Sequence, residues 1–147
     1  LKEDKLRNFG MQSLSSAKRA QVRKGLRLTE IKKIDVIEEV IDDIREIEMS
    51  KAARIGHENP EYYKKQYETW KAWIIKQVEA DKGKKEYWGS YYNGTLIAFM
   101  KILQINSTMI INYAASHTEH LDKCPNDALT FSVLEYCRDL KNCMADV

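Results

Sequence analysis

The sequence predicts an α+β fold on three observations. The first is a meander of strand patterns in which Lys85–Tyr92 and Leu96–Ile105 are joined by Asn93-Gly94. Both turn residues accept positive φ, so this dipeptide is a strong signal for a tight hairpin. The second observation is a pair of amphipathic helix patterns ahead of the meander, and the third is a helix pattern, Ala128–Leu140, behind it. Without repeats or low-complexity linkers, residues 1–147 are expected to form one domain.

Ahead of the meander the chain begins with a basic lead, residues 1–25. Several serines are N-cap candidates for a short basic helix over Ala17–Lys24, which Gly25 is expected to end. The core, residues 26–147, then opens with Leu26–Ile34, whose imperfect apolar alternation favours a strand.

The first long helix is expected to be capped by Asp35. Isoleucines and valines recur at helical spacing from Val36 to Ile47 and therefore share one face. The helix is expected to run to about Arg54, with Gly56 as its stop.

The second long helix is expected at Glu61–Ala80, after a break at His57–Pro60 with Asn59 as a candidate cap. Its apolar stripe predicts core packing, with a stacking platform for bases as the alternative. The stripe consists of Tyr63, Tyr67, Trp70, Trp73, Ile74 and Val78.

Two further strands complete the pattern. Asn106-Ser107 turns the chain into a third meander strand, Met109–Ala115, and Cys143–Val147 reads as the opening of a last strand. The predicted order is therefore β-α-α-β-β-β-α-β.

The composition, 44% hydrophobic and 31% charged, is typical of a soluble globular domain. No apolar run approaches the roughly 20 residues that span a bilayer, and the N-terminus lacks the apolar core of a signal peptide. Three cysteines are an odd count without zinc-type spacing, which indicates reduced thiols. We therefore expect a cytoplasmic protein.

Charge is unevenly placed along the chain. Residues 1–33 contain ten basic and three acidic residues, giving +7, so the remainder carries −5 of the net +2. A basic arm indicates an anionic partner. Arg19, Arg23 and Lys24 are candidates for contacting the phosphates of a nucleotide-linked acceptor or a tRNA acceptor stem. A solvated, lysine-rich helix face is the alternative.

The element order is similar to that of the GNAT N-acyltransferase superfamily. Four strings sharpen the resemblance toward its Fem-type branch, the peptidoglycan-bridge aminoacyl transferases. The strings are SSAKRAQVRKGLRLTEI (15–31), RIGHENPEYYKKQY (54–67), NGTLIAFMKI (93–102) and SHTEHLDKCPNDALTFSVLEYCRDL (116–140). The resemblance covers roughly Ser13 to Val147 and lies in the order of the strings more than in any one of them.

The sequence departs from the family pattern in two ways. A complete family domain continues past the fifth strand with a helix and two strands, whereas this pattern ends with the fifth strand, so we expect a fragment, a domain whose missing part is supplied elsewhere, or a shortened member. Users of acyl-coenzyme A in the superfamily carry a basic, glycine-containing loop before the third helix, whereas His120–Ala128 contains no glycine. Fem-type enzymes use aminoacyl-tRNA instead. Both acyl-coenzyme A and aminoacyl-tRNA therefore stay open as donors.

The resemblance also implies a site. The donor lies where the fourth and fifth strands splay apart, with backbone N–H groups of the fourth strand facing the acyl carbonyl and the next helix start facing phosphate. The implied donor-binding residues are Tyr113, Ala114, Ala115, Asn126, Asp127 and Ala128. Ser116, His117 and Glu119 are the nearest polar side chains, and His117 or Glu119 is the candidate base. Solvent-exposed loop residues without a catalytic role are the alternative.

Two other groups of residues have side chains suited to ligand binding. His117, Glu119, His120, Asp122 and Cys124 have metal-ligating side chains, but their spacing matches no closed tetrahedral pattern, so no metal is predicted. The strand aromatics alternate between two faces, and Tyr92 is a candidate for lining an acceptor groove on the face that is not core.

The leading functional hypothesis is an N-acyltransferase that moves an acyl or aminoacyl group to a small-molecule amine or a nucleotide-linked amine. A non-catalytic module that binds an anionic partner, a nucleotide-sugar or RNA, is the first alternative. The second is an incomplete domain that forms a homodimer through the exposed edge of its fifth strand.

Overall fold

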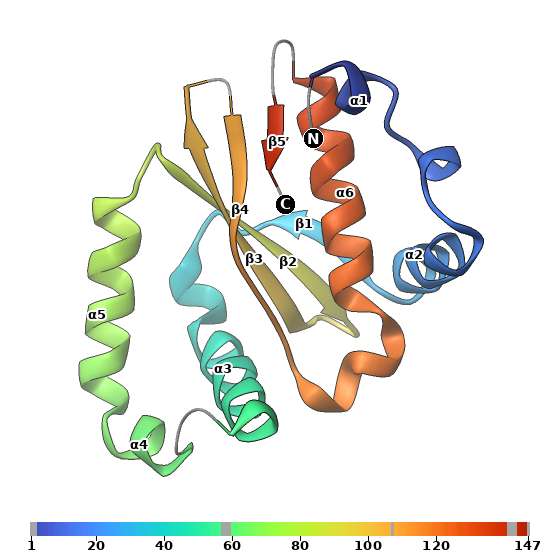
Figure 1. Cartoon of the computed structure of the whole chain (residues 1–147). Coiled ribbons are helices and arrows are strands. Elements are labelled where there is room, and N and C mark those ends of the chain that lie inside the picture. Colours follow the sequence, from blue (N-terminus) through green and yellow to red (C-terminus); the bar gives the residue numbers. More distant parts are fainter. Residues whose placement is uncertain (1–2, 57–59, 107, 141–143, 147) are drawn as a thin grey trace.

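The structure, a computed structural model, describes residues 3–56, 60–106, 108–140 and 144–146. A five-stranded sheet in the order β1-β2-β3-β4-β5 separates two groups of helices (Figure 1). Its strands are β1 Glu30–Lys33, β2 Lys85–Tyr92, β3 Thr95–Ile105, β4 Thr108–Ser116 and β5 Met144–Asp146. Neighbours from β1 to β4 pair antiparallel, and β5 pairs parallel with β4. The predicted α+β fold with a mostly antiparallel sheet is confirmed.

The helices cover both faces of the sheet (Figure 1). One face packs against α1 Glu3–Arg7, α2 Ser16–Leu28 and α6 Pro125–Asp139. The other carries α3 Ile41–Ile55, α4 Pro60–Lys65 and α5 Tyr67–Ala80. Three 3-10 helices connect these elements: η1 Met11–Ser13, η2 Ile37–Val40 and η3 Thr118–Lys123.

Each face of β3 has its own core because side chains alternate along a strand. Ala98, Met100 and Ile102 are buried against Leu129 and other residues of α6. Phe99, between them, is buried on the opposite face with the isoleucines of α3. The sheet is therefore buried on both sides in its centre.

Two local features of the meander bear on the site. The β2–β3 turn has Asn93 at φ 50° and Gly94 at φ 83°, which confirms the predicted hairpin. In the β3–β4 ladder, Lys101 pairs with Tyr113 whereas Ile102 pairs with Ile111. Asn112 is thus the extra residue of a β-bulge, which bends β4 beside the candidate site.

The predicted stop at Gly25 is wrong. Helix α2 continues through Gly25 to Leu28, and the first strand is confined to β1. Gly25 is buried where α2 meets α6: a Cβ on it would lie 2.6 Å from the Cys124 carbonyl oxygen and 2.7 Å from the Cβ of Ala128. A glycine is needed at this position because α2 and α6 pack closely here, and not because the chain changes direction.

Two helix starts also differ from the prediction. Asp35 does not cap α3, because the chain first forms η2, which follows Val36 without a side-chain cap. Helix α6 begins at Pro125, three residues before the predicted Ala128, since proline suits the first helical position. The predicted end of α3 is confirmed, with Gly56 at φ 66° after Ile55.

The second long helix is divided into α4 and α5 at Gln66. Tyr67, the first residue of α5, donates a hydrogen bond to Asp42 of α3, and the Arg45 guanidinium lies 4.4 Å from its ring centre. Along the predicted stripe Ile74 is buried, but Trp73 is 55% exposed, so core packing holds for only part of it. The predicted break at His57–Asn59, Ser107 of the predicted turn, and Cys143 and Val147 of the predicted last strand lie outside the described residues.

Candidate functional site

Strand β4 has an open edge over its second half. β5 pairs only with Thr108–Ile110, and no described strand continues along that side. The backbone N–H of His117 donates to the Ile97 carbonyl of β3 at 2.9 Å. Since backbone groups alternate in direction along a strand, Ser116 and Ala114 turn theirs toward the open edge. Such an edge offers N–H and C=O groups to a ligand.

Two cations of α3 contact the carbonyls of that edge. Lys51 Nζ donates to the Ala114 carbonyl at 3.0 Å, and the Arg54 guanidinium donates to the Ser116 carbonyl at 3.4 Å. The edge therefore presents N–H donors beside two positive charges. An arrangement of this kind stabilises negative charge that develops on an acyl oxygen.

The loop after β4 is fastened to the end of α3. The Thr118 N–H donates to Ser50 Oγ at 2.8 Å, and Thr118 Oγ1 donates to the Ser50 carbonyl at 3.0 Å. Arg54 also donates to Thr118 Oγ1 at 3.2 Å. These contacts fix the position of the flanking side chains, His117 and Glu119.

A cavity of about 490 Å³ lies between α3 and η3. It includes two of the three predicted catalytic residues, His117 and Glu119, together with Arg54 and Glu46 of α3. Its mixture of carboxylates and a guanidinium is suited to a polar substrate.

His117 and Glu119 differ in their capacity to accept a proton. His117 Nδ1 accepts a hydrogen bond from the Glu119 backbone N–H at 3.3 Å. Neutral imidazole has one donor and one acceptor nitrogen, so this geometry assigns the proton to Nε2. The His117 lone pair is thereby engaged, whereas the Glu119 carboxylate is exposed.

Ser116 lies apart from that cavity. Its side chain is only 1% exposed, and its Oγ accepts a hydrogen bond from Asn126 Nδ2 at 3.1 Å. The bond connects the end of β4 to the first turn of α6. This contact gives Ser116 a positioning role in the structure.

The first turn of α6 contains the three implied phosphate-binding residues. Pro125 has no N–H, and the Ala128 N–H donates to the Cys124 carbonyl at 3.2 Å, so the N–H groups without an intrahelical partner are those of Asn126 and Asp127. Cys124 provides no side-chain cap. The Asp127 carboxylate accepts from Lys18 of α2 at 2.7 Å, which offsets its negative charge at this helix start.

The implied donor residues of β4 have different surroundings. Tyr113 turns its side chain to the α3 face, where its hydroxyl donates to Glu48 at 2.6 Å and Lys51 Nζ lies 4.0 Å from its ring centre. Ala115 is buried on that face as well. The Ala114 backbone lies at the open edge, as described above.

Of the four predicted substrate-binding residues, Lys24 and Tyr92 lie near η3. Arg23 and Lys24 of α2 are exposed, and Arg19 is half-buried. A hydrogen bond from Lys123 lowers the pKa of Asp122 in η3, and the charge of Lys24 contributes, which places Lys24 near the loop. From the sheet, Tyr92 has Lys123 Nζ 4.8 Å from its ring centre.

Burial lowers the pKa of His120 below its ordinary 6.5, and the positive charge of Lys123 adds to this effect. The unfolded chain then binds the His120 proton more readily than the folded one. Stability should therefore be unaffected by this group above about pH 7 and should fall as the pH drops through about 6.5. We expect His120→Gln to reduce that loss, measured by urea unfolding between about pH 5 and 7. An unchanged pH dependence in the variant would contradict this assignment.

Sequence reasoning missed Ser50, Lys51 and Arg54. Lys51 and Arg54 continue the spacing of Ile44 and Ile47 along α3, but charged side chains give no apolar signal, so the pattern predicted no contact for them. Their contacts with β4 and η3 come from distant parts of the chain. Within the described ranges, no three His, Cys, Asp or Glu side chains converge on a metal position. In the same part of the chain, no helix is long and apolar enough to cross a bilayer.

Neither a protein-family model nor a curated protein matches the sequence. Solved structures do match. PaiA N-acetyltransferase from Thermoplasma acidophilum, in complex with coenzyme A, is 14% identical at a TM-score of 0.58, covering 74% of this chain and 72% of that one. FemX is 14% identical at a TM-score of 0.65, and the match covers 95% of this chain and 48% of the FemX chain. A possible acetyltransferase from Clostridium difficile 630 is 14% identical at a TM-score of 0.60, and the match covers 81% of this chain and 77% of that one.

These likenesses, at low identity, show the fold: the chain has the fold of GNAT-type acyltransferases. It spans about half the length of the FemX chain. The likeness to FemX and that to the acetyltransferases both agree with the fold expected from the order of elements.

Proposed function

We propose that this chain catalyses N-acyl transfer, moving an acyl or aminoacyl group from a donor to a small-molecule amine or a nucleotide-linked amine. The observation that carries the proposal is the open edge of β4, where Ala114 and Ser116 turn their backbone groups outward. The cavity that contains Glu119, called the Glu119 cavity below, lies beside that edge, because Arg54 lines it and donates to the Ser116 carbonyl. The end of β4 is joined to the first turn of α6 through Asn126. Acyl transfer needs such a combination of oxyanion donors, a proton acceptor and a donor-binding surface.

Each residue has a defined task in this reaction. The amine nitrogen attacks the acyl carbon, and the resulting oxyanion accepts a hydrogen bond from one N–H group of the open edge, that of Ala114 or that of Ser116. Glu119 accepts the amine proton, directly or through a water molecule, while His117 orients the Glu119 backbone. Collapse of the intermediate forms the amide and breaks the bond to the donor. The leaving thiolate or alkoxide takes up a proton, from protonated Glu119 or from water.

Two donors are compatible with the site. The N–H groups of Asn126 and Asp127 suit a phosphate of acyl-coenzyme A, and the PaiA structure is a coenzyme A complex. Aminoacyl-tRNA is favoured by the coverage of 95% of this chain in the FemX match and by the exposed cations of α2. We assign the chain to the Fem-like branch as part of this proposal, with action in the cytoplasm.

Binding of each donor tests the proposal. Coenzyme A and acetyl-coenzyme A would be titrated by calorimetry, and charged tRNA by filter binding at low salt. We expect saturable binding of one donor class, weakened when Asn126→Asp places a carboxylate at the helix start. Glu39→Gln, an exposed substitution in η2, is the matched control. Failure of both donor classes to bind would contradict acyl transfer.

Binding of an anionic polymer without catalysis is a second candidate, favoured by Arg23 and Lys24. Both are exposed, and neither forms an ion pair with another described residue. Changing either to glutamine should weaken RNA binding and reduce the slope of log affinity against log salt by about 1. Lys76→Gln on α5 is the control, because Lys76 is exposed on the other helical face of the sheet. Binding that does not respond to salt would remove this candidate.

Homodimerisation through an exposed sheet edge stays a third proposal. The predicted edge is that of the fifth strand, and β5 lies at one edge of the described sheet. Strand β1 lies at the other edge, with three of its four residues exposed. Light scattering that finds only monomer at high protein concentration would contradict it.

A further inference from the structure

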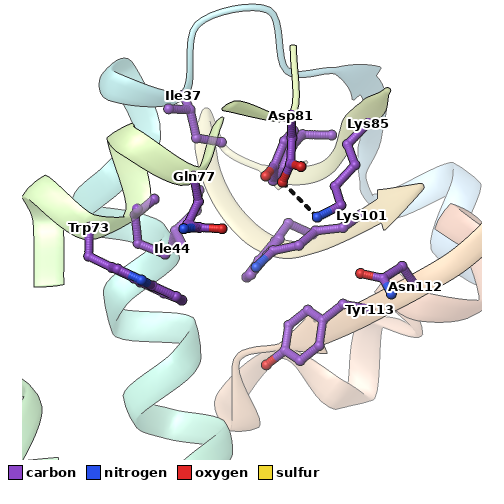
Figure 2. Close-up of a pocket in the computed structure, with 12 residues that line it drawn as sticks. Ile37, Ile44, Trp73, Gln77, Asp81, Lys85, Lys101, Asn112 and Tyr113 are labelled. Atoms are coloured by element: carbon purple, nitrogen blue, oxygen red, sulfur yellow. Dashed lines mark hydrogen bonds and ion pairs between the residues drawn. The ribbon is translucent and has the colours of Figure 1, made fainter. Parts of the chain in front are cut away.

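A second cavity, of about 180 Å³, lies between α5 and the sheet, away from the Glu119 cavity (Figure 2). Helix α5 and η2 form one side, and β2, β3 and β4 form the other. A water molecule needs about 10–15 Å³ of such space, so the cavity has room for a small organic molecule.

The lining is divided by chemistry. Ile37, Ile44, Ile74 and Phe99 are buried and form the apolar part. Lys101 and its polar neighbours form the rest, and Figure 2 shows the Lys101 side chain extending from β3 into the space below α5. An apolar pocket with a few fixed polar groups is the usual form of a small-molecule site.

Nearby charged groups are already committed to other partners. Lys85 Nζ donates to Asp81 at 2.6 Å, and Glu48 accepts the Tyr113 hydroxyl at 2.6 Å. Lys51 Nζ donates to the Ala114 carbonyl. Each of these charged side chains therefore already has a hydrogen-bond partner within the protein.

Lys101 has no such counterpart among the described residues. Its Nζ forms no hydrogen bond or ion pair there, and lies 4.8 Å from the ring centre of Tyr113 and 5.6 Å from that of Phe99. Burial lowers the pKa of Lys101 from its ordinary 10.5, while the charge of Glu48 partly opposes this. A largely desolvated ammonium without an anion is costly, and a ligand anion would relieve that cost.

We propose that this cavity binds a small molecule carrying one carboxylate, which pairs with Lys101, and an apolar or aromatic body, which lies against Phe99 and Ile74. Asn112, the bulged residue of β4, offers an amide donor at the same wall. One available ammonium suits a single negative charge. The carboxylates of Asp81 and Glu48 disfavour a more highly charged anion such as a phosphate dianion.

The apolar side of the site is accessible from the surface of α5. Trp73 lines the cavity and is 55% exposed, so its indole stands at the boundary between pocket and solvent (Figure 2). A ligand ring can reach the buried isoleucines along this indole. This inference does not depend on acyl transfer, because Lys101, Phe99 and Ile74, which hold the ligand, have no part in that proposal.

The probes are benzoate and 3-phenylpropionate, each compared with its neutral amide in titrations followed by NMR. We expect both carboxylates to shift the Trp73 indole and the Asn112 amide saturably, and to bind about tenfold more tightly than their amides, as for a hydrogen bond to a charged group. Carboxylates that do not bind, or that bind no better than the amides, would overturn the proposal.

Variants then locate the charge. Lys101→Met should remove the preference for carboxylate over amide, and Lys101→Arg should retain it. Lys76→Met, on α5 but outside the cavity, removes the same charge and should leave the preference intact. Equal losses in Lys76→Met and Lys101→Met would assign the effect to net charge and overturn the site. If Lys101→Met fails to fold, the test rests on Lys101→Arg, which should retain the preference for carboxylate, and on the comparison of carboxylates with amides in the unaltered chain.

Discussion

Replacing Glu119 by glutamine is expected to lower the turnover number of acyl transfer by about 10²–10⁴-fold, the usual contribution of a general base. Glutamine keeps the size of the side chain and its exposure at the cavity between α3 and η3, but it cannot accept the amine proton. Because Glu119 holds no structural contact through its carboxylate among the described residues, donor affinity should be unchanged. The measurement is kcat from steady-state kinetics, with donor affinity from calorimetry.

His117 provides the sharper comparison. Its Nδ1 accepts from the Glu119 backbone, so His117→Asn, which has an acceptor at a similar distance from the backbone, should reduce kcat less than Glu119→Gln. Glu39→Gln is the control for loss of one exposed carboxylate. A larger loss in His117→Asn than in Glu119→Gln would make the imidazole the proton acceptor and contradict the assignment drawn from its tautomer.

The meander and its turn could be predicted because local chemistry decides them. Asn93-Gly94 needs no tertiary contact to favour positive φ, and the strand patterns around it are long. The C-terminal end of α3 and both ends of β2 were predictable for the same reason. Element order then led to the acyltransferase fold, although no single string was specific.

The remaining parts depend on contacts between distant segments. Lys51 and Arg54 lie on the same side of α3 as Ile44 and Ile47, but only the fold shows that the edge of β4 contacts them. Trp73 reads as core, yet α5 leaves a cavity between itself and the sheet, so the indole stays exposed. A pattern along one helix cannot state which other element, if any, covers that helix.

The two cavities involve different groups of β4. Its Ala114 and Ser116 backbone groups face the open edge, while the bulge at Asn112 and the side chain of Tyr113 contribute to the wall of the Lys101 cavity. Tyr113 thus stands between them, with Lys51 and Lys101 both close to its ring. A carboxylate bound at Lys101 would therefore lie next to β4, the strand that presents the donor-binding edge.

Gly25→Ala is expected to destabilise the fold, although alanine is the better helix former. Alanine gains up to about 1 kcal/mol inside a helix. Its Cβ would lie 2.6 Å from the Cys124 carbonyl oxygen and 2.7 Å from the Cβ of Ala128. Overpacking of this kind typically costs about 1–3 kcal/mol, and here one neighbour is backbone, which cannot move away by changing a rotamer. We expect a net loss of about 1–2 kcal/mol of unfolding free energy, measured by urea denaturation.

The same substitution should reach the donor site, because Cys124 is the N-cap of α6 and adopts φ 55°. Pushing its carbonyl away would move the N–H groups of Asn126 and Asp127, so donor affinity should fall together with stability. Gln21→Ala, an exposed substitution one turn earlier in α2, is the control and should be neutral or slightly stabilising. If Gly25→Ala raised stability as Gln21→Ala does, α2 and α6 would have to be farther apart than described, and the positioning of the α6 start by α2 would be refuted.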